Sequence, residues 1–170
     1  GHNESDINYY KGLGCTDVRV MQSLMIPEGL VPRSKWGNGT IIGGNFVSWY
    51  GGFDSYIVAQ EFETDIFAPS MGRRIKREDE MEISHLPYMS WLSWMNNLSR
   101  FKYAVHLMPT QAAGTFALNC AYFGIPCIGW NKADTQNILF PDLAIDLFDN
   151  NKALELTQKL ISDSCCSSIF

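Results

Sequence analysis

The chain has little positive charge: 13 lysines and arginines stand against 18 aspartates and glutamates, for a formal charge of -5. A surface that binds nucleic acid needs clustered cations, so this balance argues against a nucleic-acid partner. The sequence also has no apolar run long enough to cross a bilayer. What remains is a hydrophobic content of 46% over 170 residues, which suffices for one globular domain with a sizeable core.

Cysteine is present, but its positions suggest neither a set of disulfides nor a metal site. The five cysteines lack the spacing of metal ligands, and their odd count does not favour disulfide pairing. Cys120 and Cys127 fall in apolar stretches, where a free thiol behaves as a small hydrophobic side chain. Because no signal peptide is visible either, we expect a cytoplasmic protein without a metal site.

The motifs of several enzyme classes are missing as well. The sequence contains no P-loop, no Ser/His/Asp set in a recognisable order, and no GxGxxG spacing of a nicotinamide site. His85 and His106 fall in predicted strands, where a lone histidine is more often a hydrogen-bonded core residue than a catalyst. Catalytic residues therefore stay unassigned.

Strands and helices alternate from Thr40 onward, which predicts a three-layer α/β/α Rossmann-like domain with a mainly parallel sheet. The strongest helical pattern, at 90–100, repeats tryptophans and aliphatic residues at helical spacing. The predicted strands are 40–43, 65–68, 81–86, 103–107, 127–129 and 141–145, and the predicted helices are 53–62, 90–100, 115–123 and 152–161.

The two ends of the chain are less regular. Residues 1–39 carry a short helical pattern at 6–11, a strand-like alternation at 17–21 and a loop rich in proline and glycine. We expect residues 1–39 to be a linker or the remnant of an N-terminal domain. The Rossmann-like domain then spans residues 40–163, and residues 164–170 form a tail.

The best candidate site is the turn that precedes the helix at 115–123. A strand–helix–strand unit puts the strand ends and the helix N-terminus at one edge of the sheet, where anions and nucleotides bind. The amides of Gly114 and Thr115 can point at an anion, and Thr115 can cap the helix. Gln111 and Asn119 offer donors and acceptors that suit ribose hydroxyls. A capped helix with one exposed amide explains this stretch equally well.

Two further turns follow predicted strands. Gly43, Gly44 and Asn45 would let the backbone approach a phosphate, although a tight strand-to-helix turn is as good an explanation. Pro87 and Tyr88 could bracket a base, but a packed loop is the favoured interpretation.

These elements resemble the C-terminal, nucleotide-sugar-binding half of GT-B-fold glycosyltransferases, over about 40–163. In that family a Pro-Ser-like step ends a strand, and a Glu, a glycine turn, a helix with a second Glu and a Gly-x-Pro step follow. The corresponding positions here are Pro109-Thr110, Gln111, Gly114, Asn119 and Gly124-Ile125-Pro126, in that order.

The resemblance implies the donor-binding domain of a hexosyltransferase-like enzyme that moves a sugar from a nucleotide-diphosphate sugar to an acceptor. It implies no permanently bound cofactor and a missing N-terminal domain that brings the acceptor and any peripheral membrane association. This chain alone would bind a nucleotide, expected to be uridine or deoxythymidine diphosphate, and turn over nothing. The implied donor-site residues are Gly43, Gly44, Asn45, Pro87, Tyr88, Gln111, Gly114, Thr115 and Asn119.

The sequence departs from the family at the two glutamates, which are amides here. Gln111 and Asn119 can bond hydroxyls but cannot supply charge. The alternative is therefore a non-catalytic nucleotide-sugar-binding or interaction module with a degenerate donor site. An unrelated receiver-like domain is disfavoured, because such a domain needs an acidic cluster at the end of its first strand.

Overall fold

The computed structural model describes residues 1–30, 37–47, 49–69, 74–110 and 112–166. In this part of the chain, six parallel strands form one sheet in the order β3-β2-β1-β4-β5-β6. The strands are β1 (Thr40–Ile42), β2 (Ile66–Pro69), β3 (Ser84–Leu86), β4 (Tyr103–His106), β5 (Cys127–Trp130) and β6 (Ala144–Ile145).

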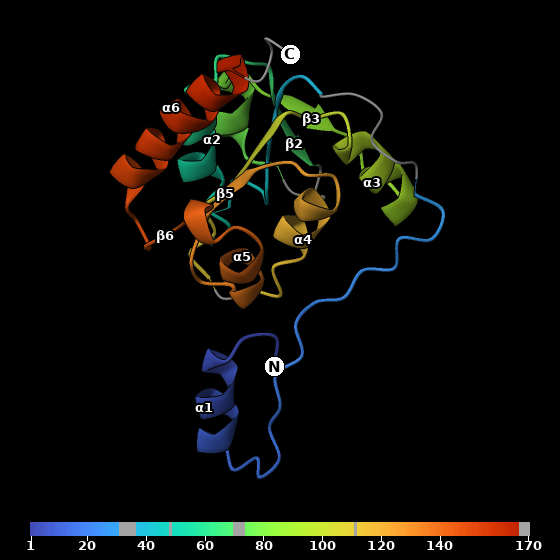
Figure 1. Cartoon of the computed structure of the whole chain (residues 1–170), viewed down its shortest axis with the longest axis vertical. Coiled ribbons are helices and arrows are strands. Elements are labelled where there is room, and N and C mark those ends of the chain that lie inside the picture. Colours follow the sequence, from blue (N-terminus) through green and yellow to red (C-terminus); the bar gives the residue numbers. More distant parts are fainter. Residues whose placement is uncertain (31–36, 48, 70–73, 111, 167–170) are drawn as a thin grey trace.

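Helices cover both faces of this sheet. Figure 1 shows α2 and α6 together on one side, and α3, α4 and α5 on the other. The helices are α1 (Ser5–Gly12), α2 (Gly52–Gln60), α3 (Trp91–Leu98), α4 (Thr115–Tyr122), α5 (Asp134–Leu139) and α6 (Asn150–Cys166), with 3₁₀ turns at Lys76–Glu80 and Pro141–Leu143.

Alternation along the strands builds two separate cores. Because successive side chains of a strand point to opposite faces, Ile41 packs with α3 and α4 while Ile42 packs with α2 and α6. Ala104 and Val105 of β4 divide in the same way. The three-layer α/β/α fold predicted from the sequence is confirmed.

Some predicted boundaries need correction. Residues 17–21 form no strand in the described chain, because no neighbouring strand pairs with them, and Asp17 and Arg19 form an exposed ion pair instead. The short helix α5 was not predicted, since six residues carry too little periodicity to recognise. The last helix was predicted to end at residue 161 and continues to Cys166. Its serines do not end it, because Ser164 donates back to the carbonyl of Leu160 at 2.8 Å.

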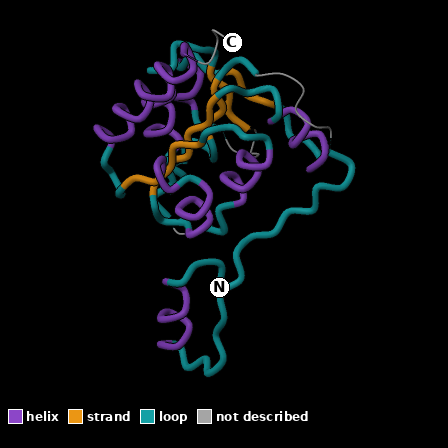
Figure 2. Tube along the Cα trace, viewed as in Figure 1, coloured by secondary structure: helices purple, strands orange, loops and turns teal. Residues whose placement is uncertain are grey.

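Helix α1 lies apart from the layered body, whereas Asn3 and residues 23–30 contact it. Helix α1 buries none of its residues, and an extended segment connects it to the sheet (Figure 2). No helix among the described residues is both long and apolar enough to span a membrane.

The strand order reverses between β1 and β4. In doubly wound sheets, ligands bind outside the carboxyl ends of the strands at such a switch point. A buried hydrogen bond fixes the end of β4 against α2. The N–H of Leu107, just past β4, donates to Ser55 Oγ of α2 at 2.9 Å. Both residues are fully buried.

Ser55→Ala should lower the free energy of unfolding by about 1–3 kcal/mol, because the buried N–H of Leu107 loses its acceptor. Guanidinium denaturation of the 170-residue chain measures this change. Ser162→Ala, which removes an exposed hydroxyl from α6, is the matched control and should change stability by less than about 0.5 kcal/mol. Equal stability of Ser55→Ala and the wild type would contradict this role of Ser55.

Candidate functional site

The turn after β1 packs tightly against β4. The N–H of Gly43 donates to the carbonyl of Val105 at 2.8 Å. A Cβ atom on Gly43 would lie 2.5 Å from the His106 ring, so no larger residue fits. Asn45 is buried, and its Oδ1 accepts from the N–H of Val47 at 3.1 Å. These contacts account for Gly43 and Asn45 as parts of a tight turn.

His106 stands at the switch point as a neutral base. Its half-buried ring packs against Phe116, with ring centres 5.0 Å apart. Burial lowers the pKa of His106 from its ordinary 6.5 to about 4, so the imidazole is uncharged at neutral pH. Such a group can donate or accept a hydrogen bond but brings no cation to the site.

The turn before α4 is held in one conformation. Gly114 has φ +71°, and a Cβ there would lie 2.5 Å from the Cβ of Thr135, so glycine is required. The carbonyl of Ala113 accepts from Ser23 Oγ at 2.7 Å and from Thr135 Oγ1 at 3.0 Å. Because C=O and N–H lie on opposite sides of a trans peptide, the N–H of Gly114 points away from both hydroxyls. This geometry orients an amide at the positive end of α4.

The N-terminal segment is tied to the same edge. Asn3 is 3% exposed, and its amide donates to the carbonyl of Ala112 at 3.1 Å while its oxygen accepts from the N–H of Asp134 at 2.8 Å. The carboxylate of Asp134 in turn accepts from the N–H of Glu4 at 2.7 Å. Sequence reasoning missed Asn3 and Ser23, because only the fold brings them to residues more than 80 positions away.

Asn119, which takes the place of a family glutamate, is a buried link between two helices. In the orientation that satisfies both of its polar groups, Asn119 donates to the carbonyl of Thr115 and accepts from Trp94 Nε1, each at 3.2 Å. This amide therefore connects α3 to α4 and forms a fixed part of the site wall.

The remaining predicted residues lie in three places. Gln111 lies outside the described residues. Pro87 and Tyr88 follow β3, and the side chain of Tyr88 is 87% exposed. Gly44 follows Gly43 in the turn after β1.

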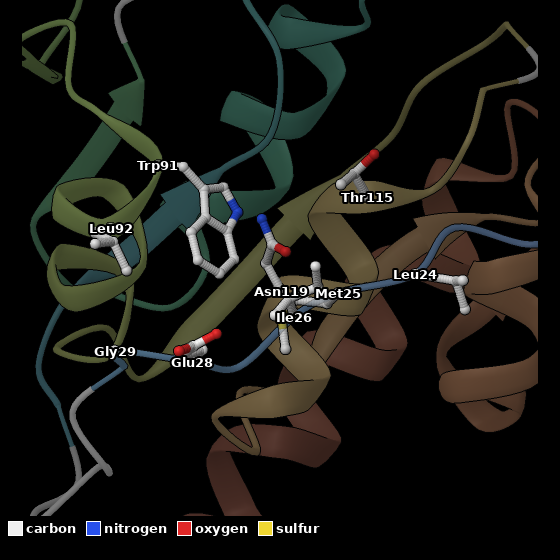
Figure 3. A pocket seen from close by; sticks show the side chains of 9 residues that line it. All are labelled: Leu24, Met25, Ile26, Glu28, Gly29, Trp91, Leu92, Thr115 and Asn119. Carbon is white, nitrogen blue, oxygen red and sulfur yellow. The ribbon is translucent and has the colours of Figure 1, made fainter.

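A pocket of about 640 Å³ opens beside the start of α4. Of the predicted site residues, it contains Thr115 and Asn119. Its other lining residues come from the segment predicted to be a linker and from the helix predicted at 90–100. The hydrophobic run at 24–26 was the available signal. Figure 3 shows the residues that line this pocket: Leu24, Met25, Ile26, Glu28, Gly29, Trp91, Leu92, Thr115 and Asn119.

A second, small cavity adjoins the turn before α4, and a lysine lines it. The cavity measures about 20 Å³, room for one water molecule, and Lys132, His106 and Gly114 are among the residues that line it. Within the part of the chain that the structure describes, no three His, Cys, Asp or Glu side chains gather as a metal site would require.

The fold recurs in solved glycosyltransferase structures. The lipopolysaccharide outer core galactosyltransferase WaaB, in its apo form, matches 95% of this chain with a TM-score of 0.70 and 11% identity. A mutant of S. aureus TarM in complex with fondaparinux, α-GlcNAc-glycerol and UDP matches 94% with a TM-score of 0.70 and 10% identity. WaaG, a glycosyltransferase involved in lipopolysaccharide biosynthesis, matches 77% with a TM-score of 0.61 and 14% identity.

At sequence identities this low, structural similarity establishes the fold alone. It confirms that the chain has the Rossmann-like fold of a GT-B domain. The chain spans 52%, 36% and 40% of the lengths of WaaB, TarM and WaaG. No protein-family model and no curated protein matches the chain.

The lowered pKa of His106 should reduce the free energy of unfolding by about 3 kcal/mol as the pH decreases from 6.5 to 4, because the unfolded chain binds this proton more tightly than the folded chain. Other titrating groups add their own contributions. Between these pH values the unfolded chain binds more protons, so stability rises with pH. His106→Gln removes this component, and the difference in unfolding free energy between pH 7 and pH 4 should shrink by that amount in urea denaturation. His2→Gln, at an exposed position, is the control. An unchanged difference in His106→Gln would show that the pKa of this ring is not lowered in the folded chain.

Proposed function

Starting from the fold shared with these glycosyltransferases, we propose that the chain is the donor-binding domain of an enzyme that transfers a sugar from a nucleotide-diphosphate sugar to an acceptor. The observation that carries this proposal is the juxtaposition at one sheet edge of the oriented turn at Gly114, the start of α4 and the pocket containing Thr115 and Asn119. A helix N-terminus favours the negative charge of a diphosphate. The adjoining pocket has the size of a small-molecule site.

Within this proposal, the diphosphate lies against the amides of Gly114 and Thr115. Lys132, close to the same turn, supplies a positive charge that offsets part of the charge of the phosphates. The nucleoside then extends along α4 toward Asn119. The nucleotide sugar is a substrate, and no permanently bound cofactor is required.

The rest of the enzyme would be a second domain. The chain spans about half or less of the lengths of WaaB, TarM and WaaG, so an acceptor-binding domain and the catalytic base are assigned to a missing N-terminal part. The isolated chain would bind nucleotide without turnover.

A second candidate function is a nucleotide-sugar-binding module that has lost catalysis. The observation in its favour is Asn119, whose neutral amide is already bonded to Thr115 and Trp94. The two candidates separate in a longer protein that includes the missing domain. Sugar transfer by the wild type excludes the module, whereas transfer that appears only after glutamate replaces Gln111 and Asn119 supports it.

Thr115→Glu tests the diphosphate position. Thr115 is exposed at the first position of α4, where glutamate suits the helix but repels a bound diphosphate. In titration calorimetry with nucleoside diphosphates at millimolar concentration, we expect binding at least about tenfold weaker than wild type, or about 1.4 kcal/mol. Hydrogen exchange in the wild type should slow at the start of α4 when nucleotide is added.

The matched control is Asn151→Glu, which adds the same charge at the exposed start of α6 and should leave binding unchanged. The proposal fails if the wild type binds no nucleoside diphosphate, or if Thr115→Glu binds as tightly as the control.

A further inference from the structure

We propose that the pocket between residues 24–29 and helices α3 and α4 selects a guanine base, and that Glu28 is the residue that reads it. This inference rests on the proposed function, since it concerns the nucleoside of the same donor. It replaces the uracil or thymine expected from the sequence with a base of different hydrogen-bonding pattern.

A tight turn holds Glu28 at the rim of the pocket. The N–H of Leu30 donates to the carbonyl of Pro27 at 3.2 Å, which closes a four-residue turn. Gly29, at the third position, has φ +77°, the left-handed conformation that a type II turn requires there. The turn rests against α3, because a Cβ on Gly29 would lie 3.5 Å from a methyl group of Leu92. The backbone of Glu28 is thereby held beside α3, and Glu28 lines the pocket.

The other walls of the pocket suit a flat ring. Trp91 offers an indole face for stacking, and Figure 3 shows Glu28, Trp91 and Asn119 around the same space. Leu24 and Ile26 are 81% and 71% exposed, so apolar area is left for a ligand to cover. Asn119 cannot turn to serve another ligand group without giving up its bonds to Thr115 and Trp94.

The charge of Glu28 decides between the bases. A carboxylate only accepts hydrogen bonds, and it binds best to two adjacent donors. Guanine presents such a pair, its ring N1–H and its exocyclic amino group. Uracil and thymine present one N–H between two carbonyl oxygens, and adenine presents an amino group beside a ring acceptor. Each of these bases would set at least one acceptor against a carboxylate oxygen, so a carboxylate in the pocket favours guanine.

The selectivity is measured by titration calorimetry of the 170-residue chain with GDP, UDP, dTDP and ADP. We expect GDP to bind at least about tenfold more tightly than the other three, since a site built for a pair of donors rejects bases that lack them. Glu28→Gln should remove most of this preference, because its amide sets a donor against one of the guanine donors. The same amide can pair with the N–H and a carbonyl of uracil, so UDP binding should tighten.

Two controls isolate the role of Glu28. Glu61→Gln removes another exposed charge, after α2 and away from the pocket, and should keep the GDP preference. Trp91→Ala should weaken all four nucleotides by about tenfold through lost stacking, without changing their order. Equal urea midpoints confirm that each variant is folded.

The outcomes separate the inference from the proposed function. Nucleoside diphosphates that bind at the start of α4 without a GDP preference overturn the guanine assignment and leave the donor domain standing. A GDP preference that persists in Glu28→Gln overturns the role of Glu28. If none of the four nucleotides binds, the proposed function fails and this inference fails with it.

Discussion

The close approach of β1 and β4 at their carboxyl ends governs the architecture of this edge. Gly43 leaves room for His106 and nothing more, and the hydrogen bond from Leu107 to Ser55 fixes the end of β4 against α2. With these strands held together, the turns that follow them have little freedom. The chain after β4 must leave along the edge, and α4 then starts beside the switch point.

Much of this arrangement could be predicted from residues alone. Consecutive apolar residues such as Ile41 and Ile42, or Ala104 and Val105, are typical of a strand that is buried on both faces. The small residues before α4 predict its turn. The N-terminal segment could not be placed in this way. Asn3 and Ser23 carry no periodic pattern, and their partners become neighbours only once β5 and α4 are assembled.

At the candidate site too, some residues follow from local sequence patterns and others only from the assembled fold. Gly114, Thr115 and Asn119 could be selected as candidates because the order of elements around them is regular. Glu28 and Trp91 were missed as site residues, since a turn in a linker and a tryptophan on an amphipathic helix have ordinary structural explanations. The amide at residue 119 was recognised as unusual, but its bonds to Thr115 and Trp94 depend on how α3 and α4 pack. Such bonds are a tertiary property that no local pattern contains.

The hydrogen bonds of Asn3 also affect how the chain unfolds locally. Asn3 spans from the turn before α4 to the start of α5, so breaking its two bonds frees both places at once. Proteins open locally in cooperative units, and here residues that are distant in sequence would belong to one such unit. Fraying of the first few residues would therefore reach the centre of the sheet edge, although α1 itself buries nothing.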